Sequence, residues 1–349
     1  MIYINGRFLT QPLAGVNRFA YELTRALIDI GVQITIICPR QVINTTYDIR
    51  GFNIIRYGYG KSHIWEQLSL PFFFIGKRNY VLVNFTGLGP IVVFNKVITI
   101  HDLAFLENPS WYKKSYVLLY KFLTPISAKT SKHILTVSNF SKKEIINKIR
   151  VREDCISVIY NAANICEKEQ TGILDRIPSE YILAVSSIDP RKNFERLISV
   201  FSQQSNYNLV VVGGGYHTFG EVDITTNKKN IFFLGRVSDA ELASLYKNAT
   251  AFIYPSLYEG FGIPPIEAMS YGCPAVVSDI NVLHEVCGDA VLYVNPYDTN
   301  DMAKTIETIS TNAELRAELI EKGYKNIMNF NWHKSSNTLK HILGQFVDL

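Results

Sequence analysis

The segment Glu259-Gly260-Phe261-Gly262-Ile263-Pro264-Pro265-Ile266-Glu267 places two carboxylates around a tight turn. Its glycines allow the backbone to bend and to be approached closely, and its adjacent prolines fix the φ angle that a helix needs at its first positions. The apolar run 250–254 before the segment predicts a buried strand, and the run 266–272 predicts a short helix that ends at Gly272. A strand, a loop and a helix in this order are typical of a parallel α/β sheet.

The predicted helix start is suited to binding an anion. Backbone N–H groups at a helix N-terminus lack partners within the helix, so they attract phosphate. A carboxylate one turn in can accept two hydrogen bonds from neighbouring hydroxyls such as those of ribose, and the combination predicts a nucleotide-sugar site. The helix dipole alone would favour Glu267 in the first turn. An ordinary cap, however, needs neither the glycine turn nor Glu259 eight residues earlier.

With these residues the chain resembles the retaining glycosyltransferases of family 4, which have two facing Rossmann-like domains (the GT-B fold) and a Glu-x7-Glu motif. Within that family it is most similar to the mannosyltransferase-B-like enzymes of bacterial surface polysaccharide assembly. The resemblance covers nearly the whole length, and only the segment 258–279 is highly specific by itself. The matching segments are 15–23, 101–109, 134–145, 189–198, 233–242, 258–279 and 283–296.

The resemblance implies roles for the residues of this loop. Glu267 is expected to bind the ribose hydroxyls, and Glu259 is expected to bind the hydroxyls of the transferred sugar. The backbone amides of Phe261, Gly262 and Ile263 are expected to face the distal phosphate.

A pair of cations, Arg191 and Lys192, follows the predicted strand 181–187. A positive pair at the carboxyl end of a strand would neutralise a diphosphate leaving group, as a metal ion does in many other transferases. The alternative is a solvent-exposed pair beside an ordinary turn. The family commonly has an arginine at the end of that strand, where this chain has two serines. Lys192 is therefore the first candidate, and whether Arg191 supplies the second charge stays open.

Three further positions are candidates. His101 leaves the predicted strand 96–100, and the family residue at this position lies beside the donor sugar, although a core or loop histidine is the default. Gly15 opens the first predicted helix as a phosphate loop would, but close packing of a helix on a strand would also require glycine. Gly213 starts the glycine run 213–215 after a strand, without the spacing of a dinucleotide-binding motif.

The order of elements predicts two parallel α/β domains, which suits a length of 349 residues. We expect an acceptor-binding domain over 1–165, a linker over 166–179 and a nucleotide-sugar-binding domain over 180–332. The resemblance implies a cleft between the domains and a last helix, 333–349, that crosses back to the first. Strands are predicted at 1–5, 32–38, 80–85, 96–100, 133–137, 156–160, 181–187, 208–214, 230–235, 250–254, 274–278 and 290–294.

Local signals mark three helix starts. The segment 15–31 places its apolar residues Val16, Phe19, Ala20, Leu23, Leu27 and Ile30 on one helical face. Capping boxes are predicted at Ser141 with Glu144 and at Ser238 with Glu241.

Charge divides unevenly along the chain. Residues 1–165 have 20 lysines and arginines against 9 acids, a net +11, which leaves 15 against 22, or −7, for residues 166–349. Ten of these basic residues lie between 111 and 152 among aromatic side chains. A solvated helix face and an anionic membrane surface explain this pattern about equally well, since each basic residue near such a surface contributes about 1 kcal/mol. Nucleic acid is a poorer partner because no motif for reading it accompanies the charge.

Several absences narrow the function. The chain has no Asp-x-Asp sequence, no metal-ligand spacing and no Gly-x-Ser-x-Gly motif, so neither a metal-bridged diphosphate nor a serine nucleophile is predicted. No cofactor is expected apart from the nucleoside diphosphate sugar as co-substrate. The five cysteines are scattered, and no signal peptide or membrane-spanning run is visible. A cytoplasmic protein, peripheral on the inner face of the membrane if the basic surface binds lipid, is expected.

The predicted function is transfer of a hexose from a nucleoside diphosphate sugar to a hydroxyl of a growing, lipid-linked bacterial glycan such as O-antigen or capsule. The resemblance implies retention at the anomeric carbon, and the subfamily favours GDP-mannose as donor. The first alternative is a nucleotide-sugar epimerase of the same fold, which would form product without an acceptor. Glycoside hydrolysis by the two carboxylates is a second alternative. A non-catalytic carbohydrate-binding module is a third.

Overall fold

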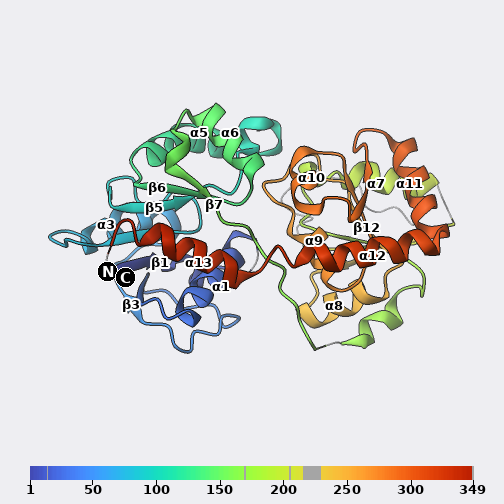
Figure 1. Cartoon of the computed structure of the whole chain (residues 1–349), viewed down its shortest axis with the longest axis horizontal. Helices are drawn as coiled ribbons and strands as arrows, with labels where there is room; N and C mark the ends of the chain where they lie inside the picture. The colour runs from blue at the N-terminus through green and yellow to red at the C-terminus, as the bar shows by residue number, and fades with distance from the viewer. Residues whose placement is uncertain (14, 169, 204–205, 215–228, 348–349) are drawn as a thin grey trace. The chain divides into compact units, whose positions relative to one another are not determined.

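The computed structural model describes residues 1–349 except for 14, 169, 204–205, 215–228 and 348–349 (Figure 1). Two units make up the chain. Unit 1 comprises residues 1–161 and 331–349, and unit 2 comprises residues 162–330. Each unit contains a parallel sheet covered by helices, which confirms the predicted fold class of two Rossmann-like domains.

Unit 1 is built on a seven-stranded sheet with the order β3-β2-β1-β4-β5-β6-β7, and all neighbouring strands run parallel. Every residue of β1 is buried, as expected for a central strand covered on both faces. The strands are β1 (Ile2–Asn5), β2 (Ile34–Cys38), β3 (Ile54–Arg56), β4 (Val81–Asn84), β5 (Lys96–Thr99), β6 (His133–Thr136) and β7 (Ile156–Val158).

The helices of unit 1 include one π-helical stretch, η2, between two short α-helices. They are η1 (Gly6–Thr10), α1 (Val16–Asp29), α2 (Ser62–Ile64), η2 (Trp65–Ser69), α3 (Leu70–Phe73), α4 (Ala104–Glu107), η3 (Pro109–Trp111), α5 (Lys114–Lys129), α6 (Asn139–Ile149), η4 (Glu153–Cys155) and α13 (Trp332–Leu343).

Helix α1 packs its apolar face into unit 1 much as its sequence period predicts. Phe19, Leu23 and Leu27 are buried, whereas Val16, at the first turn, is 41% exposed. The C-terminal helix α13 packs against α1, and the Trp332 ring meets the Phe19 ring at 6.0 Å between centroids. Residues from the two ends of the chain thus share one core.

In its described residues, unit 2 repeats this architecture with a six-stranded parallel sheet in the order β10-β9-β8-β11-β12-β13. Each strand lies where its apolar run predicts one. The strands are β8 (Ile182–Val185), β9 (Leu209–Val212), β10 (Ile231–Gly235), β11 (Ala251–Tyr254), β12 (Ala275–Ser278) and β13 (Val291–Val294). The helices are η5 (Thr171–Arg176), η6 (Pro190–Lys192), α7 (Phe194–Gln203), α8 (Asp239–Asn248), α9 (Ile263–Ser270), α10 (Asn281–Cys287), α11 (Thr299–Thr311) and α12 (Ala313–Ile327).

The structure corrects one predicted helix start and confirms another. Helix α6 is capped by Ser138, whose side chain accepts from the Ser141 backbone N–H, so the predicted cap at Ser141 is wrong by one turn. The helix begins directly after β6, because Ser138 already supplies the oxygen that the first turn needs. The capping box of Ser238 with Glu241 is confirmed at the start of α8.

In both sheets the strand order reverses beside the first strand of the unit, between β1 and β4 in unit 1 and between β8 and β11 in unit 2. Open parallel sheets bind ligands at the carboxyl ends of the strands at such a reversal. The segments that follow these four strands are therefore the places to look for function in each unit.

Over the described ranges, no helix is both long enough and apolar enough to cross a lipid bilayer.

Candidate active site

Lys192, Tyr254 and Glu259 meet where the strand order of unit 2 reverses. Lys192 ends the short helix η6 that follows β8, Tyr254 is the last residue of β11, and Glu259 lies in the loop after it. Because β8 and β11 are neighbouring parallel strands, the segments that follow them leave the same edge of the sheet. The strand order thus brings together side chains that are 67 residues apart in the chain.

The three side chains are mutually hydrogen-bonded. Lys192 Nζ donates to Glu259 Oε1 at 2.5 Å and to the Tyr254 hydroxyl oxygen at 2.9 Å. The Tyr254 hydroxyl donates to the same Glu259 Oε1 at 2.8 Å. Lys192 is 8% exposed and Glu259 is 6% exposed, so both charges are buried. Each charge is the other's partner, which a buried charge requires.

The electrostatic balance of this cluster keeps the Glu259 carboxyl ionised. Burial alone would raise the pKa of Glu259, but the positive charges of Lys192 and Arg191 and the hydrogen bonds from Lys192 and Tyr254 hold that pKa below its ordinary value. Burial, and next the charge of Glu259, raise the pKa of the Tyr254 hydroxyl well above its ordinary value. Tyr254 therefore remains a hydrogen-bond donor at neutral pH.

Arg191 is held at the same edge by the turn that precedes Lys192. Its backbone N–H donates to Asp189 Oδ1 at 3.1 Å, and its carbonyl accepts from the Leu257 N–H at 2.8 Å. Its Nε lies 3.8 Å from Asp189 Oδ1. The hydrogen bond from Leu257 to the Arg191 carbonyl joins η6 to the loop that carries Glu259. It therefore fixes the backbone of the two cations beside the loop of the carboxylate.

Asn193 fixes the backbone directly after Lys192. This residue has φ +61°, a left-handed conformation that asparagine tolerates better than most residues. Its side-chain amide donates to the carbonyls of Pro255 at 3.1 Å and Pro296 at 2.7 Å. The buried side-chain amide of Asn193 therefore connects the segments that follow β8, β11 and β13 by hydrogen bonds.

The glycine turn leads into α9 as the sequence predicts. Gly262 is the N-cap with φ +98°, and a Cβ there would lie 2.7 Å from Leu283 Cδ2, so only glycine fits. The predicted phosphate-facing amides, those of Phe261, Gly262 and Ile263, lie just before this helix and at its first residue. The two prolines that follow have no N–H, so among the first four helical positions only Ile263 and Ile266 can donate outward.

Glu267 lies in the second turn of α9 and not in the first turn, where the sequence predicts it. The helix starts at Ile263, so Glu267 is its fifth residue and belongs to the second turn, and no acidic residue occupies the first. The predicted placement in the first turn is therefore wrong, and with it the explanation of Glu267 by the helix dipole weakens. The Glu267 carboxylate accepts from the Tyr246 hydroxyl at 3.4 Å.

Gly213 lies at the carboxyl end of β9, next to the exit of β8. Its φ is +150°, and a Cβ would lie 1.7 Å from the Ser186 carbonyl oxygen, so the two backbones approach too closely for any side chain. Gly215, the last glycine of the predicted run, lies outside the described residues. Gly213 thus shapes the edge of the sheet from which the segment bearing Arg191 and Lys192 departs.

Models of two protein families match the chain, one for each half. The model described as Glycosyltransferase Family 4 matches residues 13–165, and the model described as Glycosyl transferases group 1 matches residues 169–326.

Among curated proteins, the O-antigen chain mannosyltransferase RfbU of Salmonella typhimurium strain LT2 is 37% identical over 279 residues, 78% of this chain and 75% of that protein. This chain belongs to the family 4 glycosyltransferases of the O-antigen mannosyltransferase type. O-antigen chain mannosyltransferase B of Escherichia coli is 30% identical to this glycosyltransferase over 259 residues, 68% of this chain and 66% of that protein.

Solved structures confirm the fold of the glycosyltransferase. Anabaena HepE, solved in complex with UDP and glucose, matches 99% of each chain with a TM-score of 0.75 at 15% identity. The glycosyltransferase therefore has the GT-B fold, as the resemblance implies.

His101 and Gly15 belong to unit 1 of the glycosyltransferase, whereas the cluster around Lys192 belongs to unit 2. The His101 Nε2–H donates to the Phe85 carbonyl at 2.7 Å, and the His101 carbonyl accepts from the Ser141 hydroxyl at 3.1 Å. Burial lowers the pKa of His101, so its imidazole is neutral near pH 7. The imidazole and the main-chain carbonyl of His101 thus both have partners within unit 1.

Gly15 is the N-cap of α1 with φ +50° and ψ −126°. Apart from the neighbours of Gly15 in the chain, no atom of the described residues lies within 4 Å of the position of a Cβ there, so the alternative that close packing requires glycine is wrong. Its backbone conformation, which L-residues rarely adopt, requires glycine instead.

Sequence reasoning missed Tyr254 and Asn193. Tyr254 ends a predicted strand and resembles an ordinary core residue, and Asn193 follows the cation pair without any marked spacing. The one available signal was their position at the carboxyl ends of strands. No group of three or more His, Cys, Asp and Glu side chains that could hold a metal ion occurs in the part of the glycosyltransferase that the structure describes.

Proposed function

We propose that the chain transfers a hexosyl unit from a nucleoside diphosphate sugar to a hydroxyl of a growing, lipid-linked bacterial polysaccharide, with retention at the anomeric carbon and without a metal ion. GDP-mannose is the first donor to test, because the relatives RfbU and mannosyltransferase B are O-antigen mannosyltransferases. The observation that carries the proposal is the Lys192–Tyr254–Glu259 cluster at the strand reversal of unit 2.

Lys192 is suited to a diphosphate because of its remaining hydrogen-bonding capacity. An ammonium group has three N–H donors, and the bonds to Glu259 and Tyr254 use two of them. The third can donate to a phosphate oxygen of the donor. Arg191, which lies next in the chain and whose charge acts on Glu259, adds a second positive charge. Positive charge fixed in place before the reaction stabilises a leaving diphosphate most strongly.

Glu259 is suited to the sugar. Both of its described hydrogen bonds fall on Oε1, and its carboxylate stays ionised. Oε2 can therefore accept from a hydroxyl of the transferred hexose. A carboxylate fixed by a lysine and a tyrosine positions the sugar without reorganisation during the reaction.

The proposed reaction balances as a front-face substitution. The bond between the anomeric carbon and the diphosphate oxygen breaks, and a bond from that carbon to the acceptor oxygen forms on the same face. The acceptor hydroxyl gives its proton to the departing phosphate oxygen, and the products are a nucleoside diphosphate and the extended glycan. The protein contributes position and charge stabilisation.

The test is a screen of nucleoside diphosphate sugars with the full chain and a lipid-linked oligosaccharide fraction as acceptor. Mass spectrometry identifies the added hexose, and proton NMR of the product gives its anomeric configuration relative to the donor. The proposal predicts a retained configuration that depends on the acceptor and persists in the presence of EDTA. Isomerised donor in the absence of acceptor would support the epimerase alternative instead.

Glu267→Ala is expected to weaken donor binding about tenfold to a hundredfold while kcat at saturating donor changes less than threefold. The reason is that loss of a charged partner for two ribose hydroxyls removes hydrogen bonds of about 1.5–3 kcal/mol. Calorimetric titration with GDP measures the affinity. Glu285→Ala, on the next helix of unit 2, is the matched control. An unchanged GDP affinity in the Glu267→Ala variant would show that Glu267 does not contact the donor.

Unit 1 presents an exposed apolar surface that supports membrane association. Spacing by four places Ile64, Leu68 and Phe72 on one side of the helical run α2-η2-α3, and Leu118 and Phe122 on one side of α5. All five side chains are between 63% and 73% exposed. We define the apolar surface as Ile64, Leu68, Phe72, Ile75, Val92, Phe94, Leu118, Leu119 and Phe122.

Hydrogen bonds join the three segments of this apolar surface. The side chain of Gln67 in η2 donates to the Gly89 carbonyl at 2.7 Å and accepts from the Ile91 N–H at 3.0 Å. Ser127 in α5 donates to the Leu88 carbonyl. Loop 88–94 thus links η2 and α5 within unit 1.

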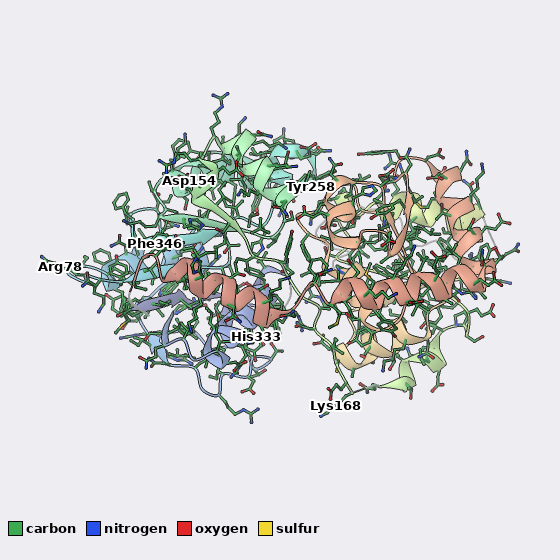
Figure 2. The ribbon with its side chains drawn as sticks, viewed as in Figure 1. Arg78, Asp154, Lys168, Tyr258, His333 and Phe346 are labelled. Atoms are coloured by element: carbon green, nitrogen blue, oxygen red, sulfur yellow. The ribbon has the colours of Figure 1, made fainter. Side chains whose placement is uncertain are left out.

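The charge around the apolar surface supports an anionic lipid bilayer as its occupant. Over residues 61–132, the one exposed acidic side chain is Glu107, which is paired with Lys148 at 2.5 Å. Arg78 projects from the loop after α3 (Figure 2). The exposed basic residues of this range are Lys61, Lys77, Arg78, Lys113, Lys114, Lys121, Lys129 and Lys132.

Replacing Lys113, Lys114 and Lys121 by glutamine is expected to weaken binding to phosphatidylglycerol-containing vesicles about a hundredfold, since each lysine contributes about 1 kcal/mol. Co-sedimentation with vesicles at two salt concentrations measures the vesicle affinity of the wild type and of the variant. The matched control replaces three exposed lysines of unit 2, at 247, 304 and 325. Binding that is absent in the wild type, or unaffected in the variant, would contradict membrane association through this surface.

A further inference from the structure

Lys96, the first residue of β5, is a buried cation that the proposed donor site does not use. It is 0% exposed. Its ammonium group donates to the Val93 carbonyl at 3.0 Å, to the Ile91 carbonyl at 3.4 Å and to the Thr130 hydroxyl oxygen at 3.0 Å. These partners are neutral, and no carboxylate of the described residues is paired with Lys96. Because a buried charge without a counter-charge is costly, stability alone does not account for it.

The end of α5 makes this position compatible with a positive charge. Thr130 is the C-cap of α5, and a cation near a helix C-terminus is favoured by the helix dipole. Burial lowers the pKa of Lys96 to about 8, so the ammonium form predominates at pH 7. That form has three N–H donors, and the structure supplies three acceptors.

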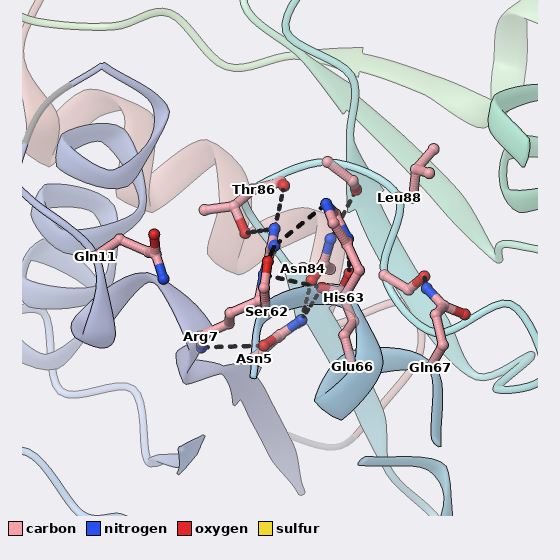
Figure 3. A network of polar contacts seen from close by, with 12 residues as sticks. Asn5, Arg7, Gln11, Ser62, His63, Glu66, Gln67, Asn84, Thr86 and Leu88 are labelled. Atoms are coloured by element: carbon pink, nitrogen blue, oxygen red, sulfur yellow. Dashed lines mark hydrogen bonds and ion pairs between the residues drawn. The ribbon is translucent and has the colours of Figure 1, made fainter. Parts of the chain in front are cut away.

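Side chains satisfy the backbone of loop 88–94 from within unit 1. The Gln67 side chain, drawn with Leu88 in Figure 3, donates to the Gly89 carbonyl at 2.7 Å and accepts from the Ile91 N–H at 3.0 Å. The Ser127 hydroxyl donates to the Leu88 carbonyl. The buried ammonium adds two more bonds to carbonyls of the same loop. The conformation of the loop therefore depends on three side chains and not on the hydrogen bonds of a helix or a sheet.

The helical runs that supply these side chains are themselves fixed on the sheet (Figure 3). Glu66, next to Gln67 in η2, is 0% exposed and accepts from Asn5 Nδ2 at 2.6 Å. Its Oε2 lies 3.1 Å from His63 Nδ1, and the Tyr120 hydroxyl of α5 lies 3.2 Å from His63 Nε2. Polar contacts thus connect η2 with β1 and α5 with the α2–η2 run.

Successive side chains of loop 88–94 point inward and outward. Val93 is 5% exposed and belongs to the core cluster that includes Trp65 and Leu70. Val92 and Phe94, on either side of it in the chain, are each 63% exposed. The loop therefore presents two apolar side chains outward while the residue between them anchors it in the core.

This arrangement suits contact with hydrocarbon. In the apolar part of a bilayer no water is available for backbone groups, so they must be satisfied within the protein. An ordinary surface loop depends on water for its carbonyls. In loop 88–94 the carbonyls of Gly89, Ile91 and Val93 have donors from the protein interior, which the buried Lys96 and Gln67 supply.

We propose that loop 88–94 inserts Val92 and Phe94 into an anionic lipid bilayer, and that Lys96 is the positioning residue that holds the loop in the inserting conformation. This inference rests on the membrane association proposed above and identifies the segment that enters the lipid. Because the loop is ordered before binding, its ordering does not reduce the affinity.

The test measures co-sedimentation of the full chain with vesicles of phosphatidylglycerol and phosphatidylcholine. Phe94→Ala is expected to weaken vesicle binding about tenfold, because an apolar side chain is lost from the lipid contact. Lys96→Met is expected to weaken it by a similar factor. In the Lys96→Met background, Phe94→Ala is expected to change the affinity less than twofold, since two changes that break one linkage are not additive. A merely structural role of Lys96 would leave the effect of Phe94→Ala intact.

Two milder variants guard against a Lys96→Met protein that does not fold. Thr130→Val removes one of the three acceptors and is expected to weaken vesicle binding about threefold, a partial loss of the same linkage. The matched control is Thr124→Val, on the buried side of α5, where the hydroxyl has no hydrogen-bond partner among the described residues. Met328→Ala, at an exposed apolar residue of unit 2, is the control for Phe94→Ala. Both controls are expected to bind vesicles as the wild type does.

The outcomes separate this inference from the proposed function. Wild-type protein that does not bind the vesicles would contradict membrane association itself, whereas GDP titration of the same samples tests the donor site independently. Wild-type binding with an unchanged affinity in Phe94→Ala would overturn insertion of the loop. A full effect of Phe94→Ala in folded Lys96→Met, or equal affinities of Thr130→Val and Thr124→Val, would overturn the role of Lys96.

Discussion

Lys192→Ala is expected to lower kcat about 10²-fold to 10³-fold, the loss typical when one fixed donor to a developing negative charge is removed. The physical reason is that Lys192 is the buried ammonium beside Glu259 with one N–H left for the leaving diphosphate. Steady-state kinetics with saturating donor and acceptor measure the effect. The KM for the acceptor is expected to stay within threefold, because the proposed contact of Lys192 is with the diphosphate of the donor and not with the acceptor.

Two controls make this result interpretable. Lys304→Ala removes an exposed lysine of unit 2 and is expected to leave kcat unchanged. Thermal unfolding shows whether the Lys192 variant is folded at the assay temperature, since it leaves the Glu259 carboxylate without its ammonium partner. A folded Lys192→Ala protein with the kcat of the wild type would remove Lys192 from the leaving-group site.

Glu259→Leu is expected to destabilise the chain by about 3–5 kcal/mol, because it strands the buried Lys192 ammonium without a counter-charge. The double variant Lys192→Met/Glu259→Leu is expected to regain most of that stability, since an apolar pair avoids the desolvation of both charges. Urea unfolding of the full chain, followed by circular dichroism, measures the free energy of unfolding of the wild type, the two single variants and the double variant. An equal loss of unfolding free energy in Glu259→Leu and in the double variant would contradict the buried ion pair.

The same carboxylate gives the stability a pH dependence of known sign. The pKa of Glu259 is lower in the folded chain than its ordinary value of about 4.3, which applies when the chain is unfolded. Its contribution is therefore fully present above about pH 4.3 and is lost as the pH falls through the lower folded pKa. The double variant is expected to lack this part of the acid sensitivity.

The sheets and the glycine turn that leads into α9 could be predicted because their signals are local. Runs such as 181–187 and 250–254 are apolar over a strand length and end in polar or glycine residues, and β8 and β11 lie there. Strand β3 was missed, since its three residues lie at the sheet edge, where two are exposed and no buried run forms. Ser138 was missed as a cap because Ser141 shows the stronger box pattern.

The contacts within the candidate site could not be predicted, because they depend on strand order. The sequence assigns both the loop 259–267 and the cations Arg191 and Lys192 to one diphosphate. The direct contact of Lys192 with Glu259 depends on β8 and β11 being neighbours in the sheet. Likewise the sequence shows Glu66 as an ordinary acid in a helical run, and only the folding of η2 against β1 brings it to Asn5 and Arg7.

The most direct test of the central claim, that Lys192 and the loop 259–267 bind a diphosphate, is calorimetric titration of the full chain with GDP, GMP and guanosine, repeated with the uridine series. We predict that in one series the diphosphate binds at least about a hundredfold more tightly than the nucleoside, as two charge-assisted hydrogen bonds provide, and that Lys192→Ala removes most of this difference. Equal affinities for nucleoside and diphosphate in both series would contradict the account.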